Sequence, residues 1–253
     1  MKVSIITSCY NRAQTIQGAI ESVVTQDYPD IEYIIVDGLS NDGSMDVINQ
    51  YQGKVAKIIS ERDHGMYEAI NKGIRMATGD IIGLVHSDDF LYDNHVISDI
   101  VKTFEKTEAD FVYGDGVFVN AENINKPVRN WIGGAYHRWK VRCGWLPLHP
   151  TCYIKREVMI REDLYDESFK IAADTDLLVR YLYKANLKVK YLPRRIIRMR
   201  MGGLSTDSKK RRQMWDEDVK LYTAHGFSPV ILTKLMKMAW KVPQFIEAKF
   251  IHA

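Results

Sequence analysis

The first half of the chain alternates short apolar runs with amphipathic segments. Runs rich in β-branched residues predict strands over 3–7, 31–36, 55–60, 80–85 and 111–119. Apolar residues at helical spacing predict helices over 16–24, 44–51, 67–76 and 94–106. This alternation predicts βαβ units over about the first 120 residues, and therefore an α/β fold with a mostly parallel, Rossmann-like sheet between helices.

Polar residues follow four of the predicted strands. They occupy residues 8–12, 37–43, 61–65 and 86–89. Polar turns are common in α/β proteins, but ligands bind beyond the carboxyl ends of parallel strands. Four such turns with acidic chemistry predict a site on this rim.

Adjacent carboxylates after the fourth strand, Asp88 and Asp89, repel each other unless a cation neutralises them. Mg²⁺ or Mn²⁺ binds such oxygens together with substrate phosphates; the alternative is a helix N-cap. Asp37 and Asp63 follow the second and third strands on the same rim. Together they predict a nucleotide pocket in which a metal, rather than glycine amides, holds the diphosphate.

The pattern weakens over 120–151, which contains Trp131, Trp139 and Trp145. This stretch predicts a loop-rich insertion, with its tryptophans either in the core or forming a platform for sugar rings. A helix over 174–185 and a strand over 189–199 follow.

Composition places the chain among ordinary globular proteins, with 46% hydrophobic and 26% charged residues in 253. Net charge is +3, but residues 198–253 hold 11 Lys/Arg against 5 Asp/Glu. A basic end predicts an anionic partner, either a membrane surface or nucleic acid. Three cysteines without CxxC spacing fit a reducing cytoplasm, and no signal peptide or spanning segment is expected.

Several enzyme signatures are missing. The sequence contains no GxGxxG, GxxxxGK[ST], GxSxG or HExxH. Nicotinamide Rossmann sites, P-loop chemistry, α/β-hydrolase triads and zinc peptidases therefore have no support.

Four motifs in order carry a resemblance to a known family. They are residues 5–12 (IITSCYNR), 36–44 (VDGLSNDGS), 61–73 (ERDHGMYEAINKG) and 77–80 (ATGD). Over roughly residues 1–205 the chain resembles the inverting glycosyltransferases of family 2, which have the GT-A fold and include bacterial polysaccharide, O-antigen and capsule enzymes. The family's DXD metal motif corresponds to Ser87-Asp88-Asp89.

The resemblance implies roles for residues on the rim. Nucleotide-sugar binding falls on Thr7, Tyr10, Asp37, Asp63 and Asp88, and the Mn²⁺ or Mg²⁺ ligand is Asp89. Residues near the acceptor are expected to include Trp145 and His149. The segment 202–206 resembles the family's flexible segment over the donor.

The resemblance also implies a catalytic base at Asp174. The family's usual preceding Glu is Ala173 here, which leaves Asp176 as a weaker candidate. A helix cap is the alternative role for Asp174.

The expected organisation is a GT-A domain over 1–205, with a nucleotide-sugar half (1–120) and an acceptor half (121–205), and a basic helical extension over 206–253. The extension has an apolar stripe formed by Ile231, Leu235, Met238, Val242 and Phe245. Lys234, Lys237 and Lys241 flank it, and Pro243 should kink the helix. Such a helix lies in a membrane interface or packs on the catalytic domain.

The predicted function is metal-dependent, inverting transfer of a sugar from a nucleotide sugar, with UDP favoured. The acceptor would be a saccharide or a polyprenyl-diphosphate-linked glycan of cell-surface polysaccharide synthesis, in the cytoplasm or at the inner face of the cell membrane. One alternative is a degenerate saccharide-binding scaffold. Another is a sugar-1-phosphate nucleotidyltransferase, which would require a glycine-rich turn after the first strand, where this chain has Ser8-Cys9-Tyr10-Asn11. Nucleic-acid binding lacks a motif.

Overall fold

The structure is a computed structural model that describes residues 1–202 and 210–247, with side chains described as far as residue 244. The strands are β1 (Val3–Cys9), β2 (Ile31–Asp37), β3 (Lys57–Ser60), β4 (Ile81–Leu84), β5 (Phe90–Leu91), β6 (Phe111–Val119), β7 (Pro127–Trp131), β8 (Tyr153–Lys155) and β9 (Val189–Arg200). The α-helices are α1 (Ile16–Val24), α2 (Ser44–Asn49), α3 (Met66–Met76), α4 (Val96–Thr107), α5 (Arg138–Arg142), α6 (Arg156–Arg161), α7 (Ala173–Val179), α8 (Arg211–Ala224), α9 (Val230–Ala239) and α10 (Val242–Glu247).

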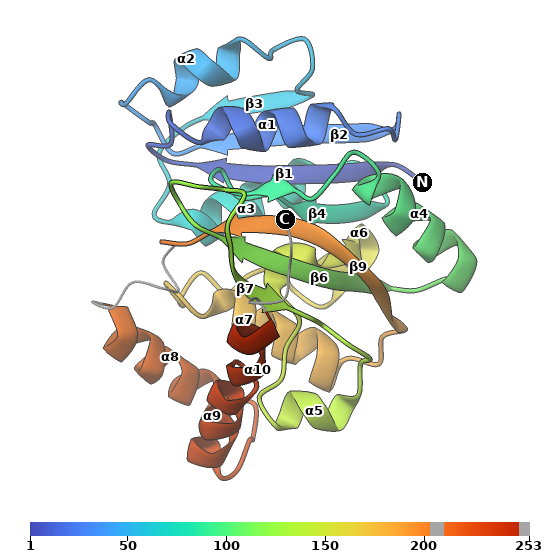
Figure 1. Ribbon diagram of the computed structural model, residues 1–253, viewed down its shortest axis with the longest axis vertical. Coiled ribbons are helices and arrows are strands. Elements are labelled where there is room, and N and C mark those ends of the chain that lie inside the picture. The colour runs from blue at the N-terminus through green and yellow to red at the C-terminus, as the bar shows by residue number, and fades with distance from the viewer. Residues whose placement is uncertain (203–209, 248–253) are drawn as a thin grey trace.

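One sheet in the order β3-β2-β1-β4-β8-β6-β9-β5 runs through the molecule, and β7 pairs with β6 (Figure 1). The first four strands are all parallel. Beyond β4 the sheet is mixed, because β8 runs antiparallel to both β4 and β6 while β6 and β9 are parallel. The predicted α/β fold is confirmed, with the parallel arrangement concentrated in β1 to β4.

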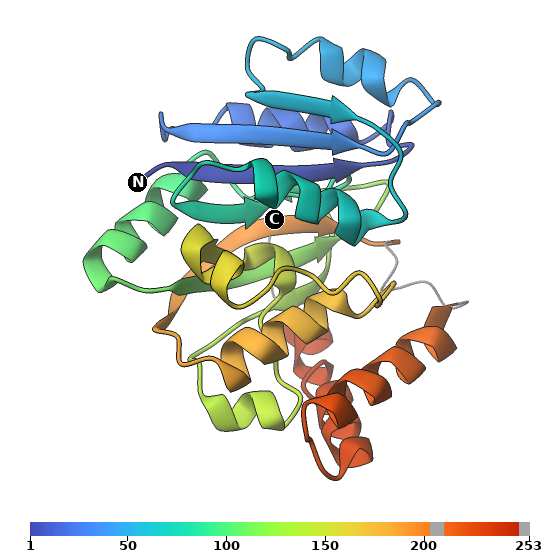
Figure 2. The same cartoon turned by 180° about the vertical axis from the view of Figure 1, so that it is seen from behind.

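Strand residues point alternately to the two faces of the sheet, and both faces are buried. Ile5 belongs to a core with α1 and α4, whereas its neighbour Ile6 belongs to a core with α3, α6 and α7. Figure 1 shows α1 and α4 on the near face, and Figure 2 shows α3, α6 and α7 on the opposite face. Helices therefore cover both faces, and the strand ends form the open rim.

The part of the chain after residue 120 is more structured than the sequence predicted. The expected loop-rich stretch contains β7, α5 and a 3₁₀ turn at His149–Thr151. The helix predicted over 174–185 changes character midway, because α7 is followed by π-helical turns over Arg180–Lys184.

The C-terminal helices pack beside β7 and α7 (Figure 1). Glu217 of α8 accepts hydrogen bonds from the backbone N–H groups of Ile171 and Ala172, both at 2.9 Å, just before α7. Arg129 of β7 donates from Nε to Gln244 Oε1 of α10 at 2.6 Å. In the described part of the chain, no helix is both long and apolar enough to cross a membrane.

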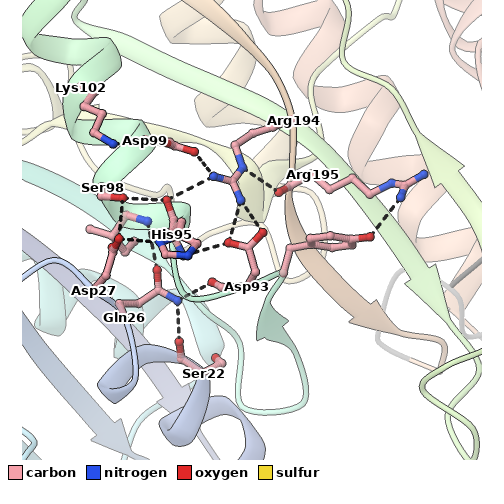
Figure 3. Close-up of polar contacts among 12 residues, drawn as sticks. Ser22, Gln26, Asp27, Asp93, His95, Ser98, Asp99, Lys102, Arg194 and Arg195 are labelled. Carbon is pink, nitrogen blue, oxygen red and sulfur yellow. Dashed lines mark hydrogen bonds and ion pairs between the residues drawn. The ribbon is translucent and has the colours of Figure 1, made fainter.

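A charge network fastens the middle of β9 to α4 and to the segment before α4. Arg194 binds the carboxylates of Asp93 and Asp99 together with the carbonyl of His95 (Figure 3). His95 continues the network to Asp27, after α1, with 2.6 Å between Nδ1 and Oδ2. This network ties together three segments of the chain away from the rim.

Candidate active site

A cleft of about 620 Å³ opens at the carboxyl ends of β1 and β4. Its wall includes residues 8–12, Asp63 and residues 86–89 from the donor-side rim. Later parts of the chain, including the C-terminal helices, complete the lining with Asp174, Lys237 and Lys241. Three of the four polar turns noted in the sequence thus line one cavity, and the candidate base lines it too.

The first two motifs hold each other in place at the donor end. Asn11 donates from its backbone N–H to Ser40 Oγ at 2.8 Å, and its Oδ1 accepts from the N–H of Asn41 at 3.0 Å. Asn11 has a φ of 53°, a left-handed conformation that asparagine tolerates better than most residues. The loop thereby presents Tyr10, which is 59% exposed, to the cleft.

Two of the residues predicted to bind the nucleoside lie beneath the cleft, outside its lining. Thr7 is buried and donates from Oγ1 to the carbonyl of Val85 at 2.6 Å. Asp37 is also buried, and its carboxylate accepts from the N–H of Ser40 at 3.0 Å and from Ser60 Oγ at 2.7 Å. In this structure both residues shape the turns that carry the rim.

Asp63 stands at the cleft wall because a glycine leaves room for it. A Cβ on Gly38 would lie 2.5 Å from Asp63 Oδ2 and 3.4 Å from the Tyr10 ring. Burial raises the pKa of Asp63, despite the hydrogen bond that its Oδ1 accepts from the N–H of Gly65 at 3.0 Å. Gly38 therefore has a steric reason to be glycine that the sequence motif alone does not reveal.

Asp89 carries a buried carboxylate oxygen that lacks a hydrogen-bond partner among the described residues. Its Oδ1 accepts from the backbone N–H of Arg200 at 3.0 Å, whereas Oδ2 is the unpartnered atom. Burial and the neighbouring charge of Asp88 raise the pKa of Asp89 well above its usual range. An uncompensated buried oxygen beside a second carboxylate is the chemistry that a divalent cation stabilises.

The residues present fit a metal that shares its ligands with a substrate. Across 1–202 and 210–247 no cluster of three or more His, Cys, Asp or Glu side chains could hold an ion. Mg²⁺ commonly uses one or two carboxylates and completes its shell with phosphate oxygens and water. Asp88 and Asp89 match that donor set.

The two candidate bases on α7 have different environments. Asp174 lines the cleft, and burial raises its pKa. Asp176 is buried away from this lining, where its carboxylate binds Arg180 at 2.8 Å and His225 at 2.7 Å. A base must reach a substrate proton, so the geometry favours Asp174 over Asp176.

Of the two residues expected near the acceptor, one lines the cleft and the other does not. His149 lines the cleft, and its Nε2 lies 2.6 Å from Tyr165 Oη. Burial and the neighbouring His86 lower the pKa of His149 to about 3, which keeps its ring neutral. Trp145 is buried, packs edge-on against Tyr113 and is outside the cleft lining.

The cleft wall also contains cationic groups that were not predicted to lie there, including Lys237 and Lys241, which the sequence indicated only as neighbours of the apolar stripe. Arg200, at the end of β9, donates from Nε to the carbonyl of Asp88 at 2.9 Å. Arg129, Lys237 and Lys241 line the same cleft. The spacing of Lys234, Lys237 and Lys241 was the available signal in the sequence. Spacing alone does not reveal which face of the helix is turned towards the cleft. Residues 203–206 of the expected flexible segment lie outside the described residues.

Comparison with known proteins gives a family match and several relatives. The model described as "Glycosyl transferase family 2" matches residues 4–169. A PGL/p-HBAD biosynthesis glycosyltransferase of Mycobacterium bovis is 26% identical over 193 residues, covering 75% of this chain and 73% of the relative. An uncharacterized glycosyltransferase of Nostoc sp. is 38% identical over 111 residues, 43% of this chain and 34% of the relative.

Solved structures share the fold at low sequence identity. Residues 1–349 of S. aureus TarS, in complex with UDP-GlcNAc, align with a TM-score of 0.72 at 18% identity. The alignment covers 88% of this chain and 66% of the TarS chain, so this chain spans slightly less than two thirds of TarS 1–349. The mannosyltransferase PcManGT from Pyrobaculum calidifontis, with GDP-Man and Mn²⁺, aligns at a TM-score of 0.64 and 16% identity, covering 98% and 73% of the two chains.

Proposed function

The chain belongs to glycosyltransferase family 2, and we propose that it moves a sugar from a UDP-sugar to an acceptor hydroxyl with inversion at the anomeric carbon. The observation that carries this proposal is one cleft lined by Tyr10, Asp63, Asp88, Asp89 and Asp174. UDP and UDP-GlcNAc are the ligands in the TarS complexes, which supports a uridine donor.

In the proposed reaction Asp174 takes the proton from the acceptor hydroxyl as that oxygen attacks the anomeric carbon. Burial raises the pKa of Asp174, which makes its carboxylate a stronger base than an exposed aspartate. Asp88 and Asp89 would hold Mn²⁺ or Mg²⁺, whose chemistry is to neutralise the charge on the departing nucleoside diphosphate. A single displacement turns an α-linked donor into a β-glycoside.

We propose a saccharide or a polyprenyl-diphosphate-linked glycan as acceptor, within cell-surface polysaccharide synthesis. The mycobacterial relatives are named for PGL/p-HBAD biosynthesis. The acceptor end of the cleft has apolar side chains of Trp131 and Leu146 beside its charged groups, which suits a sugar ring with polar edges.

Calorimetric titration with UDP, GDP and dTDP, each with Mn²⁺ and again with EDTA, tests the donor site. We expect metal-dependent binding of UDP in preference to the other two. Asp216→Asn, an exposed carboxylate on α8, is the control for Asp89→Asn, which should lose the metal dependence. Failure of folded wild-type protein to bind any of the three nucleotides would refute the proposed donor site.

We also propose peripheral contact with the cytoplasmic face of a membrane through α9 and the start of α10. Large apolar side chains on the outer face are each more than half exposed: Ile231, Leu232, Leu235, Met238 and Val242. The inner face carries Thr233 and Lys234, which are buried. An ordinary surface helix buries its apolar face and exposes its polar face, whereas this helix exposes its apolar face.

A lipid surface suits this face better than a purely apolar protein partner, because basic and aromatic residues border it. Trp215 of α8 is 39% exposed and stacks under Lys234 at 3.8 Å, and Arg211 is exposed one turn earlier on the same helix. Basic residues and tryptophan beside an apolar stripe are typical of interfacial helices.

Co-sedimentation with anionic phospholipid vesicles tests this contact. The double variant Leu235→Glu/Met238→Glu should release the protein into the supernatant. Ile160→Glu, on an apolar residue of α6 that is 50% exposed, should not. If instead the wild type ignores vesicles and the double variant abolishes a dimer seen by light scattering, the face binds a second copy and the membrane proposal is wrong.

A further inference from the structure

The inner face of the C-terminal helices brings several cations to one wall of the cleft. Lys237 lies in α9, and Lys241 follows four residues later, between α9 and α10; both line the cavity that Asp174 lines. Arg129 approaches from β7 and lines the same cavity. These groups are outside the donor-side rim and have no role in the reaction as proposed above.

One carboxylate serves two of the lysines. Asp218 of α8 binds Lys234 at 3.2 Å through Oδ2 and Lys237 at 3.0 Å through Oδ1. Asp218 is itself buried, so its charge is already compensated by these two ammonium groups. It has little left with which to neutralise a third cation.

Lys241 is that third cation. Among the described side chains no carboxylate lies within ion-pair distance of its ammonium group. Burial, together with the neighbouring Lys237 and Arg129, lowers the pKa of Lys241 to about 8, although Asp218 and Asp174 act in the opposite direction. The ammonium form is still the main one at pH 7, so the fold holds an insufficiently compensated cation in the wall of a cleft.

Arg129 is held rigidly next to this amine. Its guanidinium lies over the rings of Phe118 at 4.9 Å and Trp131 at 4.6 Å, while Nε binds Gln244. Burial lowers the pKa of Arg129 to about 10, which still leaves it charged. Asp88 and Asp89 are two like charges that favour a cation. Lys241 and Arg129 are likewise two like charges in the cavity, and they favour an anion.

We propose that Lys241, assisted by Lys237 and Arg129, binds a phosphate or diphosphate group of the acceptor. This inference rests on the proposed function and gives its acceptor a chemical class: a phosphorylated saccharide carrier. Among the described residues, the cations Lys237, Lys241 and Arg129 line the same cavity as the carboxylates of Asp174 and Asp218, and Lys234 outside the lining already pairs with Asp218. Lys241 would position the acceptor, while Asp174 takes the proton from its hydroxyl.

Calorimetry in EDTA tests the site, because without a metal the carboxylates of the donor end repel a diphosphate. The probes are inorganic phosphate, inorganic pyrophosphate and farnesyl diphosphate. Lys241→Met keeps the aliphatic stem and removes the charge, and we expect it to weaken diphosphate binding at least tenfold. Lys220→Met is the matched control, because Lys220 is exposed on α8 and lies outside this cleft lining; its binding should equal that of wild type.

Each outcome has a defined meaning. Tighter binding of farnesyl diphosphate than of pyrophosphate indicates a lipid-borne acceptor, whereas equal binding indicates a water-soluble phosphorylated one. Equal affinity of Lys241→Met and wild type, or no diphosphate binding at all, overturns the inference. A UDP–Mn²⁺ titration of the same preparations keeps the two proposals apart: if UDP binds and diphosphate does not, only the acceptor inference fails.

Discussion

Two clusters of charge in this molecule differ in how completely they are paired. Around Arg194 one guanidinium meets two carboxylates, with Nη2 at 2.7 and 2.6 Å from the two oxygens of Asp93 and Nη1 on Asp99 (Figure 3). In the cleft wall formed by the C-terminal helices, Asp218 pairs with two ammonium groups, whereas Lys241 has no carboxylate within ion-pair distance among the described side chains. The first cluster is neutral or slightly acidic by itself; the second is not compensated.

We interpret this difference as one between charges that stabilise the fold and charges that are proposed to bind a ligand. Arg194 joins β9 to α4, and its partners come from the same structural region. Lys241, Asp89 and Asp174 instead face a cavity, and each has a pKa shifted by burial against its charged form. We therefore expect loss of stability from changes in the first cluster, and loss of function from changes in the second.

Asp174→Asn should have the largest effect. Removing the base should lower the rate of sugar transfer by about 10²–10⁴-fold, because that is the usual contribution of a general base. UDP binding should survive, since the proposed partner of Asp174 is the acceptor and not the nucleotide. Initial rates with saturating UDP-sugar, together with UDP titration, measure both quantities.

The comparison variant for the base is Asp176→Asn, on the same helix. It should lower stability, because it weakens the pairing with Arg180 and His225, yet keep the rate per folded molecule. If Asp174→Asn transfers sugar normally and Asp176→Asn does not, the base assignment moves to Asp176.

Arg194→Met should lower the free energy of unfolding by about 1–3 kcal/mol, because it leaves two carboxylates facing each other without their cation. This loss of stability is smaller than for a fully buried pair, because Asp93 and Asp99 are more than a third exposed. Urea unfolding followed by circular dichroism measures the change. An unaltered midpoint would show that the network contributes nothing, and the contrast between the clusters would disappear.

Asp89→Asn should raise stability in EDTA by about 1 kcal/mol, because it removes an uncompensated buried charge. The folded pKa of Asp89 lies above its unfolded value, so the wild type loses stability as the pH rises through the unfolded value towards the folded one. The advantage of the variant should therefore grow between pH 4 and pH 7. A variant less stable than wild type at pH 7 in EDTA would contradict this account.

Periodicity in the sequence predicted the parallel half of the sheet well, because strands such as β1 and β2 are apolar on both faces. It missed β5, which has only two residues, and the antiparallel insertion of β8 between β4 and β6. Pairing partners far apart in the chain leave no periodic signal. The α/β class was confirmed, whereas the mixed strand order beyond β4 could not be predicted from the sequence.

The motifs located the cleft but not the depth of each residue in it. Tyr10, Asp63, Asp88, Asp89, Asp174 and His149 line the cavity, whereas Thr7, Asp37 and Trp145 do not. Asp37 illustrates the reason: a carboxylate after a strand can bind a ligand or its own turn, and here Ser40 and Ser60 hold it. For a similar reason, the sequence did not predict that Lys237 and Lys241 face the cleft. A helical period does not specify which face of a helix is buried.

The smallest effect should come from Lys102→Met, at the exposed margin of the Arg194 network. Lys102 is 72% exposed, and its Nζ lies 3.5 Å from Asp99 Oδ1, a geometry that contributes little in water. We expect a change in the free energy of unfolding within about 0.5 kcal/mol, measured by urea denaturation beside Arg194→Met. A loss above 1 kcal/mol would mean that Asp99 depends on both cations, and that Arg194 alone does not account for the pairing in this cluster.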